Sequence, residues 1–124
     1  MLEGGPVLKN LIKTPLGTIN ITREVIAVVA GNAAIECYGL VGMVSQKMSD
    51  GIIELLGRDN LGKGVEVHID ENNLIVDIYI AVQYGIKISE VAHNVIEKVH
   101  YNLNKYLGIV PDKVNVIVKT VRVK

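Results

Sequence analysis

The spacing of apolar residues changes in the middle of the chain, at Gly85. In residues 74–84 apolar side chains recur at every second position, which is typical of a strand with one buried face. In residues 86–107 they recur at every third or fourth position, which indicates an amphipathic helix. The pattern therefore predicts a strand that turns directly into a helix. Gly85 is the expected turn residue, and Gly108 is expected to end the helix.

The same alternation predicts two more strands. Residues 65–70 alternate, and residues 71–73 form a polar turn, so this segment should pair antiparallel with the strand that follows it. Residues 114–123 form the last strand, where the charges of Lys119, Arg122 and Lys124 should protect a sheet edge from pairing with another chain.

A first helix is predicted to begin near Arg23, with Thr22 as its N-cap. Between residues 25 and 35 it is apolar on almost every side, so it should be buried on several sides. Its small residues let another backbone approach closely, either the sheet beneath the helix or a second copy of the chain. The sheet is the expected neighbour because a small domain must cover its sheet. These residues are Ala30, Gly31, Ala33 and Ala34.

The remaining segments contain glycine and proline and lack a sustained period. Residues 1–14 are expected to form a flexible N-terminal arm, and residues 15–124 a single domain. Residues 38–44 should cross in an extended conformation, with Gly39 and Gly42 as structural turns. A short helix is expected over residues 49–57, and a flexible loop over residues 58–64.

Together these elements predict an α+β fold in two layers. A three-stranded or slightly larger mixed sheet carries both long helices on one face, in the order helix, strand, strand, helix, strand. A right-handed crossover through the second long helix should set the central and last strands parallel. The central strand then lies between the first strand of the hairpin and the C-terminal strand.

The sheet face opposite the helices is the candidate interaction face. Alternation places four apolar residues there among polar neighbours, and an apolar patch on an open sheet face is unusual for a monomer. It should receive a second copy of the chain or a partner protein, with Tyr79 as its central anchor. The alternative is that residues 1–14 or 45–57 fold over this face. The four residues are Ile75, Tyr79, Ile117 and Val121.

Composition narrows the classes of function. The 124 residues include 13 basic and 13 acidic side chains, so no overall field attracts nucleic acid, and nucleic-acid binding is not expected. The single cysteine, Cys37, lies in an apolar segment, which suggests a buried, inert thiol and a reducing compartment. No apolar run reaches the roughly 18 residues of a membrane span, so we expect a cytoplasmic protein without direct membrane insertion.

No group of residues has the spacing of a catalytic or metal site, so neither an enzyme nor a cofactor or metal is expected. His68 and Asp77 point outward on neighbouring strands, where they could form a catalytic or metal-binding pair. Alternating strands also bring polar residues together without any function. His93 and His100 lie about 10 Å apart on one helix, too far to share a metal.

Two glycine patterns have spacings close to those of nucleotide-binding or RNA-binding loops. Gly39 and Gly42 match the spacing of the GxxG loop with which KH domains hold RNA, so a KH-like RNA-binding protein is the alternative function. The residues between them are apolar, whereas a phosphate clamp needs positive charge. The loop with Arg58 and Lys63 fits neither a P-loop nor a dinucleotide fingerprint.

Several motifs, taken in order, resemble the alkaline-shock protein family, also called the Gls-type envelope stress response family. The resemblance covers about residues 15–123, and residues 86–95 further resemble a short Gram-positive branch of that family. The motifs lie in residues 17–22 before residues 24–26, residues 33–42, residues 76–80 before Tyr84 and Gly85, and residues 114–116 after Gly108.

The resemblance implies a small non-enzymatic protein connected with cell-envelope or alkaline stress. Some members of the family are held at the membrane by a partner, and some self-assemble. It therefore implies a protein-interaction module that forms a homo-oligomer and is cytoplasmic or membrane-associated through a partner. Because the short branch is often found beside a dihydroxyacetone-kinase-like protein, such a protein is one candidate partner. The family supplies no catalytic residues.

Overall fold

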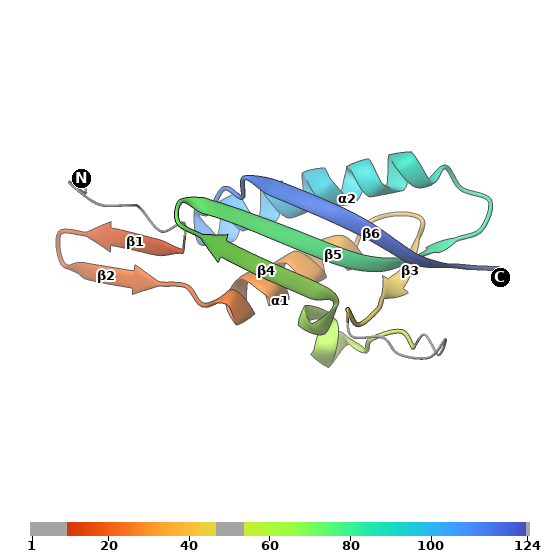
Figure 1. The fold of residues 1–124 in the computed structure, drawn as a ribbon, viewed down its shortest axis with the longest axis horizontal. Coiled ribbons are helices and arrows are strands. Elements are labelled where there is room, and N and C mark those ends of the chain that lie inside the picture. The colour runs from red at the N-terminus through yellow and green to blue at the C-terminus, as the bar shows by residue number, and fades with distance from the viewer. Residues whose placement is uncertain (1–9, 47–53, 124) are drawn as a thin grey trace.

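The computed structural model of the protein describes residues 10–46 and 54–123. Within them the chain folds into two layers, with a sheet on one side and helices on the other (Figure 1). The α+β fold class expected from the sequence is confirmed. The elements in chain order are β1 (Leu11–Thr14), β2 (Gly17–Asn20), α1 (Arg23–Ile35), β3 (Leu40–Met43), η1 (Arg58–Gly64), β4 (Val65–Asp70), β5 (Asn73–Gln83), α2 (Ile88–Asn102), η2 (Leu103–Leu107) and β6 (Lys113–Arg122).

The long strand β5 is the centre of the main sheet. β6 runs parallel to it along one edge, from Ile75 opposite Lys113 onward. β4 pairs antiparallel with the first half of the other edge, where Val65 lies opposite Ile78. β3 continues that edge antiparallel along the second half of β5. The expected order of three strands is confirmed, and the extended crossing after α1 is the fourth strand.

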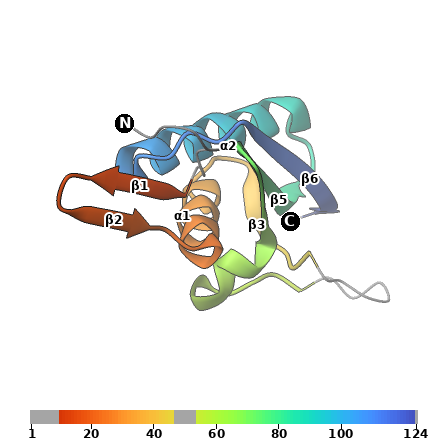
Figure 2. The same cartoon turned by 60° about the vertical axis from the view of Figure 1, so that its left-hand side comes forward.

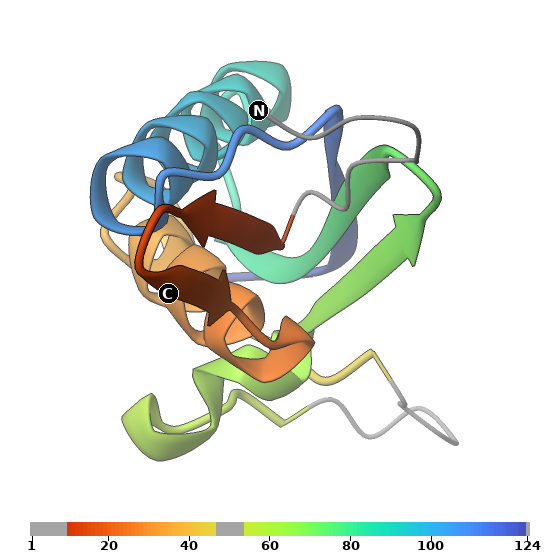
Figure 3. The same cartoon turned by 90° about the vertical axis from the view of Figure 1, so that its left-hand side faces the viewer.

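Both long helices cover the same face of this sheet. Figure 3 shows α1, in orange, and α2, in cyan to blue, side by side on one side of the strands. The core between the layers consists of aliphatic side chains, because the sequence contains neither Phe nor Trp. Its largest fully buried members are Ile26, Met43, Leu74, Ile78, Ile80, Leu103 and Ile109.

The predicted start of α1 is confirmed. The Thr22 side chain accepts a hydrogen bond from the Val25 amide at 3.3 Å, as an N-cap does. The helix is less buried than expected, because Val25 and Val28 are 42% and 45% exposed. Its small residues do allow a close approach of backbone, and the neighbour includes η1. A Cβ atom on Gly31 would lie 3.0 Å from the carbonyl oxygen of Leu61.

The chain between β3 and β4 differs from the prediction. Residues 58–64 form the short 3-10 segment η1, which is kinked at Asn60, where a flexible loop was expected. The cause is Leu61, which is buried beside α1 and anchors the segment. The described end of the expected helix over residues 49–57 is not helical, because Leu55 bridges to Val44 and the Leu56 amide donates to Met43. The rest of that expected helix lies outside the described residues.

The expected arm over residues 1–14 does not extend to residue 14. β1 and β2 form a separate hairpin that projects beyond the sandwich (Figure 2). Its turn is closed by the Thr14 hydroxyl, which accepts hydrogen bonds from the amides of Leu16 and Gly17. A two-residue turn brought two short strands together here, although their alternation was too brief to predict them. Residues 1–9 lie outside the described residues.

Two of the three glycines expected at turns lie in turns, and the third lies in a strand. Gly39 and Gly85 lie in turns with φ values of 87° and 96°, a region that other residues rarely adopt. Gly42 lies inside β3 opposite Ala81, so the expectation of a turn there is wrong. It is glycine at a close contact instead, because a Cβ atom would lie 3.2 Å from Cδ2 of Leu55.

Candidate functional site

The face of the main sheet that points away from the helices is the candidate site, and we call it the open face. Figure 1 views the sheet from this side, with the helices behind the strands. Residues paired across neighbouring strands project to the same face, so the register identifies its members. The central part contains Glu66 and His68 from β4, Ile75, Asp77 and Tyr79 from β5, and Asn115 and Ile117 from β6.

Three of the four expected apolar residues share this face, and the fourth does not. Tyr79 lies opposite Ile117, and both are partly buried, as is Ile75. β6 contains a register shift after Val118, so Val121 pairs with Val82, which belongs to the core side. The inclusion of Val121 in the candidate face is therefore wrong. A bulge adds one residue to one strand and reverses the alternation beyond it.

One end of the open face is covered by the segment that follows β3. The side chain of Leu55 lies over Gly42, which pairs with Ala81 of β5. Val44 and Ala81 are fully buried but do not belong to the main core cluster. The expected alternative, that residues 45–57 fold over this face, thus applies to its β3 end, where the Val44 amide donates to the Tyr79 carbonyl oxygen at 3.1 Å.

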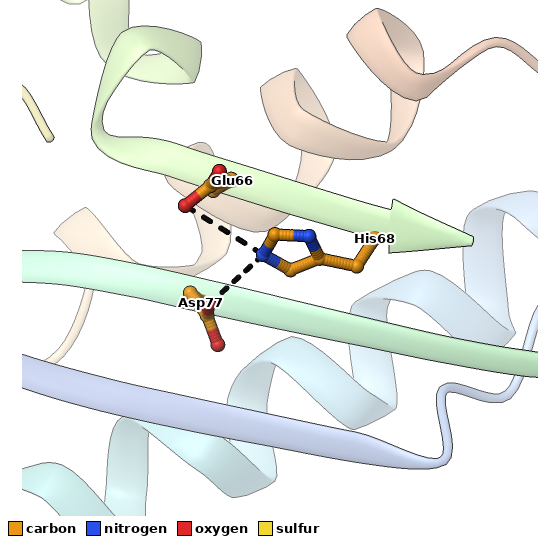
Figure 4. A group of neighbouring side chains, drawn as sticks. All are labelled: Glu66, His68 and Asp77. Atoms are coloured by element: carbon orange, nitrogen blue, oxygen red, sulfur yellow. Dashed lines mark hydrogen bonds and ion pairs between the residues drawn. The ribbon is translucent and has the colours of Figure 1, made fainter. Parts of the chain in front are cut away.

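Three polar side chains meet beside the apolar residues. The His68 Nε2 atom lies 3.2 Å from Oδ2 of Asp77 and 3.6 Å from Oε1 of Glu66 (Figure 4). We call Glu66, His68 and Asp77 the acid–histidine cluster. Its carboxylates have further partners, since Asn115 donates to Oδ1 of Asp77 at 2.9 Å and the Tyr79 hydroxyl donates to Oε1 of Glu66 at 3.3 Å.

Tyr79 connects the apolar and polar parts of the open face. Burial raises the pKa of its hydroxyl, and the negative charges of Glu66 and Asp77 raise that pKa further. The hydroxyl therefore stays protonated and donates its hydrogen bond to Glu66. The Lys119 ammonium lies 5.7 Å from the centroid of the Tyr79 ring, within the range of a cation–π contact.

Sequence reasoning singled out His68 and Asp77, and the structure brings them together. Glu66 and Asn115 had no predicted role, although the register of the β4–β5 hairpin could have paired Glu66 with Asp77. His93 and His100 do not meet; His93 pairs with Glu97 at 3.2 Å on the exposed side of α2. Burial raises the pKa of the partly buried Cys37, an effect that the nearby Lys98 opposes and Glu36 reinforces, so its thiol is a poor nucleophile.

The stretch from Gly39 to Gly42 does not form the loop that the KH comparison requires. Leu40 begins β3, and the Gly39 carbonyl accepts a hydrogen bond from the Gln83 amide at 3.1 Å. These backbone groups are engaged in the sheet, so they are not presented as a clamp for a phosphate.

The comparisons with known proteins agree on one family. Residues 11–123 match the ASP23 (alkaline-shock protein) family, which is described as having a cell envelope-related function. The chain is 49% identical over 113 residues to the uncharacterized protein YloU of Bacillus subtilis, covering 90% of this chain and 94% of that protein. It is 42% identical over 113 residues to the uncharacterized protein Spy1614 of Streptococcus pyogenes, covering 90% and 93%. It is 34% identical over 103 residues to the uncharacterized protein YqhY of Bacillus subtilis, covering 83% and 76%.

No solved structure is significantly similar to this chain. Among the described residues, no helix combines the length and apolar character needed to cross a membrane. The match covers the N-terminal hairpin, both helices and every strand of the main sheet. The chain therefore belongs to the ASP23 family of cell envelope-related proteins, as the sequence motifs indicated.

Proposed function

We propose that this protein is a non-enzymatic interaction module that associates with a second copy of itself through the open face. The observation that carries this proposal is the position of Ile75, Tyr79 and Ile117. These three side chains lie together on the sheet face that points away from both long helices. Apolar patches of this kind are typical of protein interfaces, and aromatic residues at their centre contribute much of the binding energy.

The distribution of charge on the open face favours a second copy as the occupant. The β4 side carries Glu66 and Asp70, whereas the β6 side carries Lys113 and Lys119. A two-fold axis parallel to the strands would place the β4 side of one copy over the β6 side of the other. Opposite charges then face each other at both rims, around two apolar patches. Two sheets packed in this way lie about 10 Å apart.

The experiment compares two tyrosine variants at the same protein concentration. Tyr79→Glu introduces a charge at the centre of the proposed interface, and Tyr38→Glu introduces the same charge at a side chain that is 83% exposed outside it. Mass in solution is measured by light scattering after gel filtration, and folding by circular dichroism. We expect the wild type and Tyr38→Glu to have twice the chain mass, and Tyr79→Glu to have the mass of one chain.

A folded Tyr79→Glu variant with the wild-type mass would refute the interface. The cytoplasmic location and the binding of a partner protein remain predictions that extend this proposal. Purification of wild type and Tyr79→Glu from the native cell tests them together. A partner recovered equally with both proteins binds outside the open face, and one recovered only with wild type binds on it or requires the dimer.

A further inference from the structure

We propose that the acid–histidine cluster is a binding site for a divalent transition-metal cation of the Zn²⁺ class. This inference goes beyond the proposed self-association, since all three ligands come from one chain. The cluster offers one imidazole nitrogen and two carboxylate oxygens, and these three atoms all lie within 4.8 Å of one another. Such mixed ligands are those that zinc and its neighbours in the first transition row bind.

The distances suit a small cation. Zinc lies about 2.0–2.2 Å from nitrogen and oxygen ligands, and tetrahedral geometry then separates any two ligand atoms by about 3.4 Å. His68 Nε2 is already 3.2 Å from the Asp77 oxygen and 3.6 Å from the Glu66 oxygen. Only the distance between the two carboxylates must close, and Glu66 can rotate because its side chain is 40% exposed.

The charge of the cluster also favours a cation. Two carboxylates share one imidazole, so the cluster is negative whether His68 is protonated or neutral. Among the described residues, no Lys or Arg forms an ion pair with Glu66 or Asp77. The nearby Lys119 points its ammonium at the Tyr79 ring. The Asp77 side chain is only 17% exposed, so little water compensates its charge.

The ligands are held in place by a second set of contacts. Asn115 donates to the Asp77 oxygen that does not face His68, which leaves the other oxygen directed at the cluster. The Tyr79 hydroxyl donates to the same Glu66 oxygen that lies near His68, and this contact keeps that oxygen on the side of the cluster. Glu66 and Asp77 are directly paired across β4 and β5, so rigid strands carry all three ligands. Outer contacts of this kind typically raise metal affinity by about ten- to a hundred-fold.

The test uses metal-free protein without a histidine tag, titrated with Zn²⁺ by calorimetry and with Co²⁺ by visible absorption. We expect one ion per chain. His68→Ala and Asp77→Asn should each weaken binding at least about ten-fold. The matched control is His93→Ala, because His93 also lies 3.2 Å from a carboxylate but offers only two donors that are both 68% exposed. This control should bind like wild type.

Two further arms keep this test separate from self-association. Ile117→Asp disrupts the proposed interface and retains all three ligands, so it should still bind one ion per chain even where its mass is that of a single chain. Loss of metal binding in a folded Ile117→Asp variant would overturn the site. An affinity for Zn²⁺ that is unchanged in His68→Ala would also overturn the site. Tighter binding of Mg²⁺ than of Zn²⁺ would do the same.

Discussion

Small residues on α1 set how closely the helix approaches its neighbours. Ala30 and Ala34 are completely buried, and a Cβ atom on the intervening Gly31 would lie 3.0 Å from the carbonyl oxygen of Leu61, closer than an ordinary van der Waals contact. Interiors at this density have no room for added methyl groups. The stripe of small residues was predicted from the sequence, whereas the contact with η1 arises from the folding of residues 58–64 around Leu61.

We expect Ala30→Leu to lower the free energy of unfolding by about 1–3 kcal/mol, because the larger side chain must displace packed neighbours. Val28→Leu, at a position on the same helix that is 45% exposed, is the control and should change stability far less. Denaturant unfolding measures both. Equal midpoints for the two variants would mean that this side of α1 is open rather than packed.

At the scale of elements, helices begin and end where a side chain or a glycine turn replaces the regular backbone hydrogen bonds. α1 begins where Thr22 caps the Val25 amide, and the helical chain of α2 and η2 ends at Gly108, which has a φ of 70°. β6 changes its register after Val118. The residue types at Thr22 and Gly108 predicted these two helix ends. The bulge was not predicted, because Lys119 and Thr120 fit a regular strand equally well.

We expect Thr22→Ala to lower the free energy of unfolding by about 1 kcal/mol, because one amide of the first turn of α1 loses its acceptor. Thr22→Ser keeps the hydroxyl and should retain most of the stability. Thermal unfolding followed by circular dichroism distinguishes the two variants. Equal losses in both would show that the methyl group of Thr22, and not its hydroxyl, stabilises the start of the helix.

At the scale of the whole fold, both long helices cover one face of the main sheet, and the other face has an acidic β4 side and a basic β6 side. The proposed dimer depends on this separation of charge as well as on the apolar patch. Charge attraction of this kind is screened within about 10 Å at 0.1 M salt, whereas burial of apolar surface is not.

We therefore expect Lys119→Glu to weaken the dimer, and the double variant Lys119→Glu with Glu66→Lys to recover part of it, since these two positions then again carry opposite charges on facing rims. Sedimentation equilibrium measures the dissociation constant of each protein. The wild-type constant should also rise between about 0.05 M and about 0.5 M salt. A double variant as weak as the single one would show that the rims do not face each other.

The sequence by itself determined the fold class, both long helices, the β4–β5 hairpin and the parallel crossover to β6. These follow from periodicity and from residues such as Gly85 and Gly108, whose effect is local. It also placed His68, Asp77 and Tyr79 on one face, because alternation along a regular strand needs no knowledge of its neighbours.

Only the tertiary structure decided the rest. It turned residues 58–64 into a helix, moved Val121 off the open face and placed Leu55 over Gly42. It also brought Asn115 of β6 to Asp77 of the acid–histidine cluster. Each of these outcomes depends on which residue of a distant segment lies opposite, and that register is set by the packing of the whole domain rather than by the local pattern.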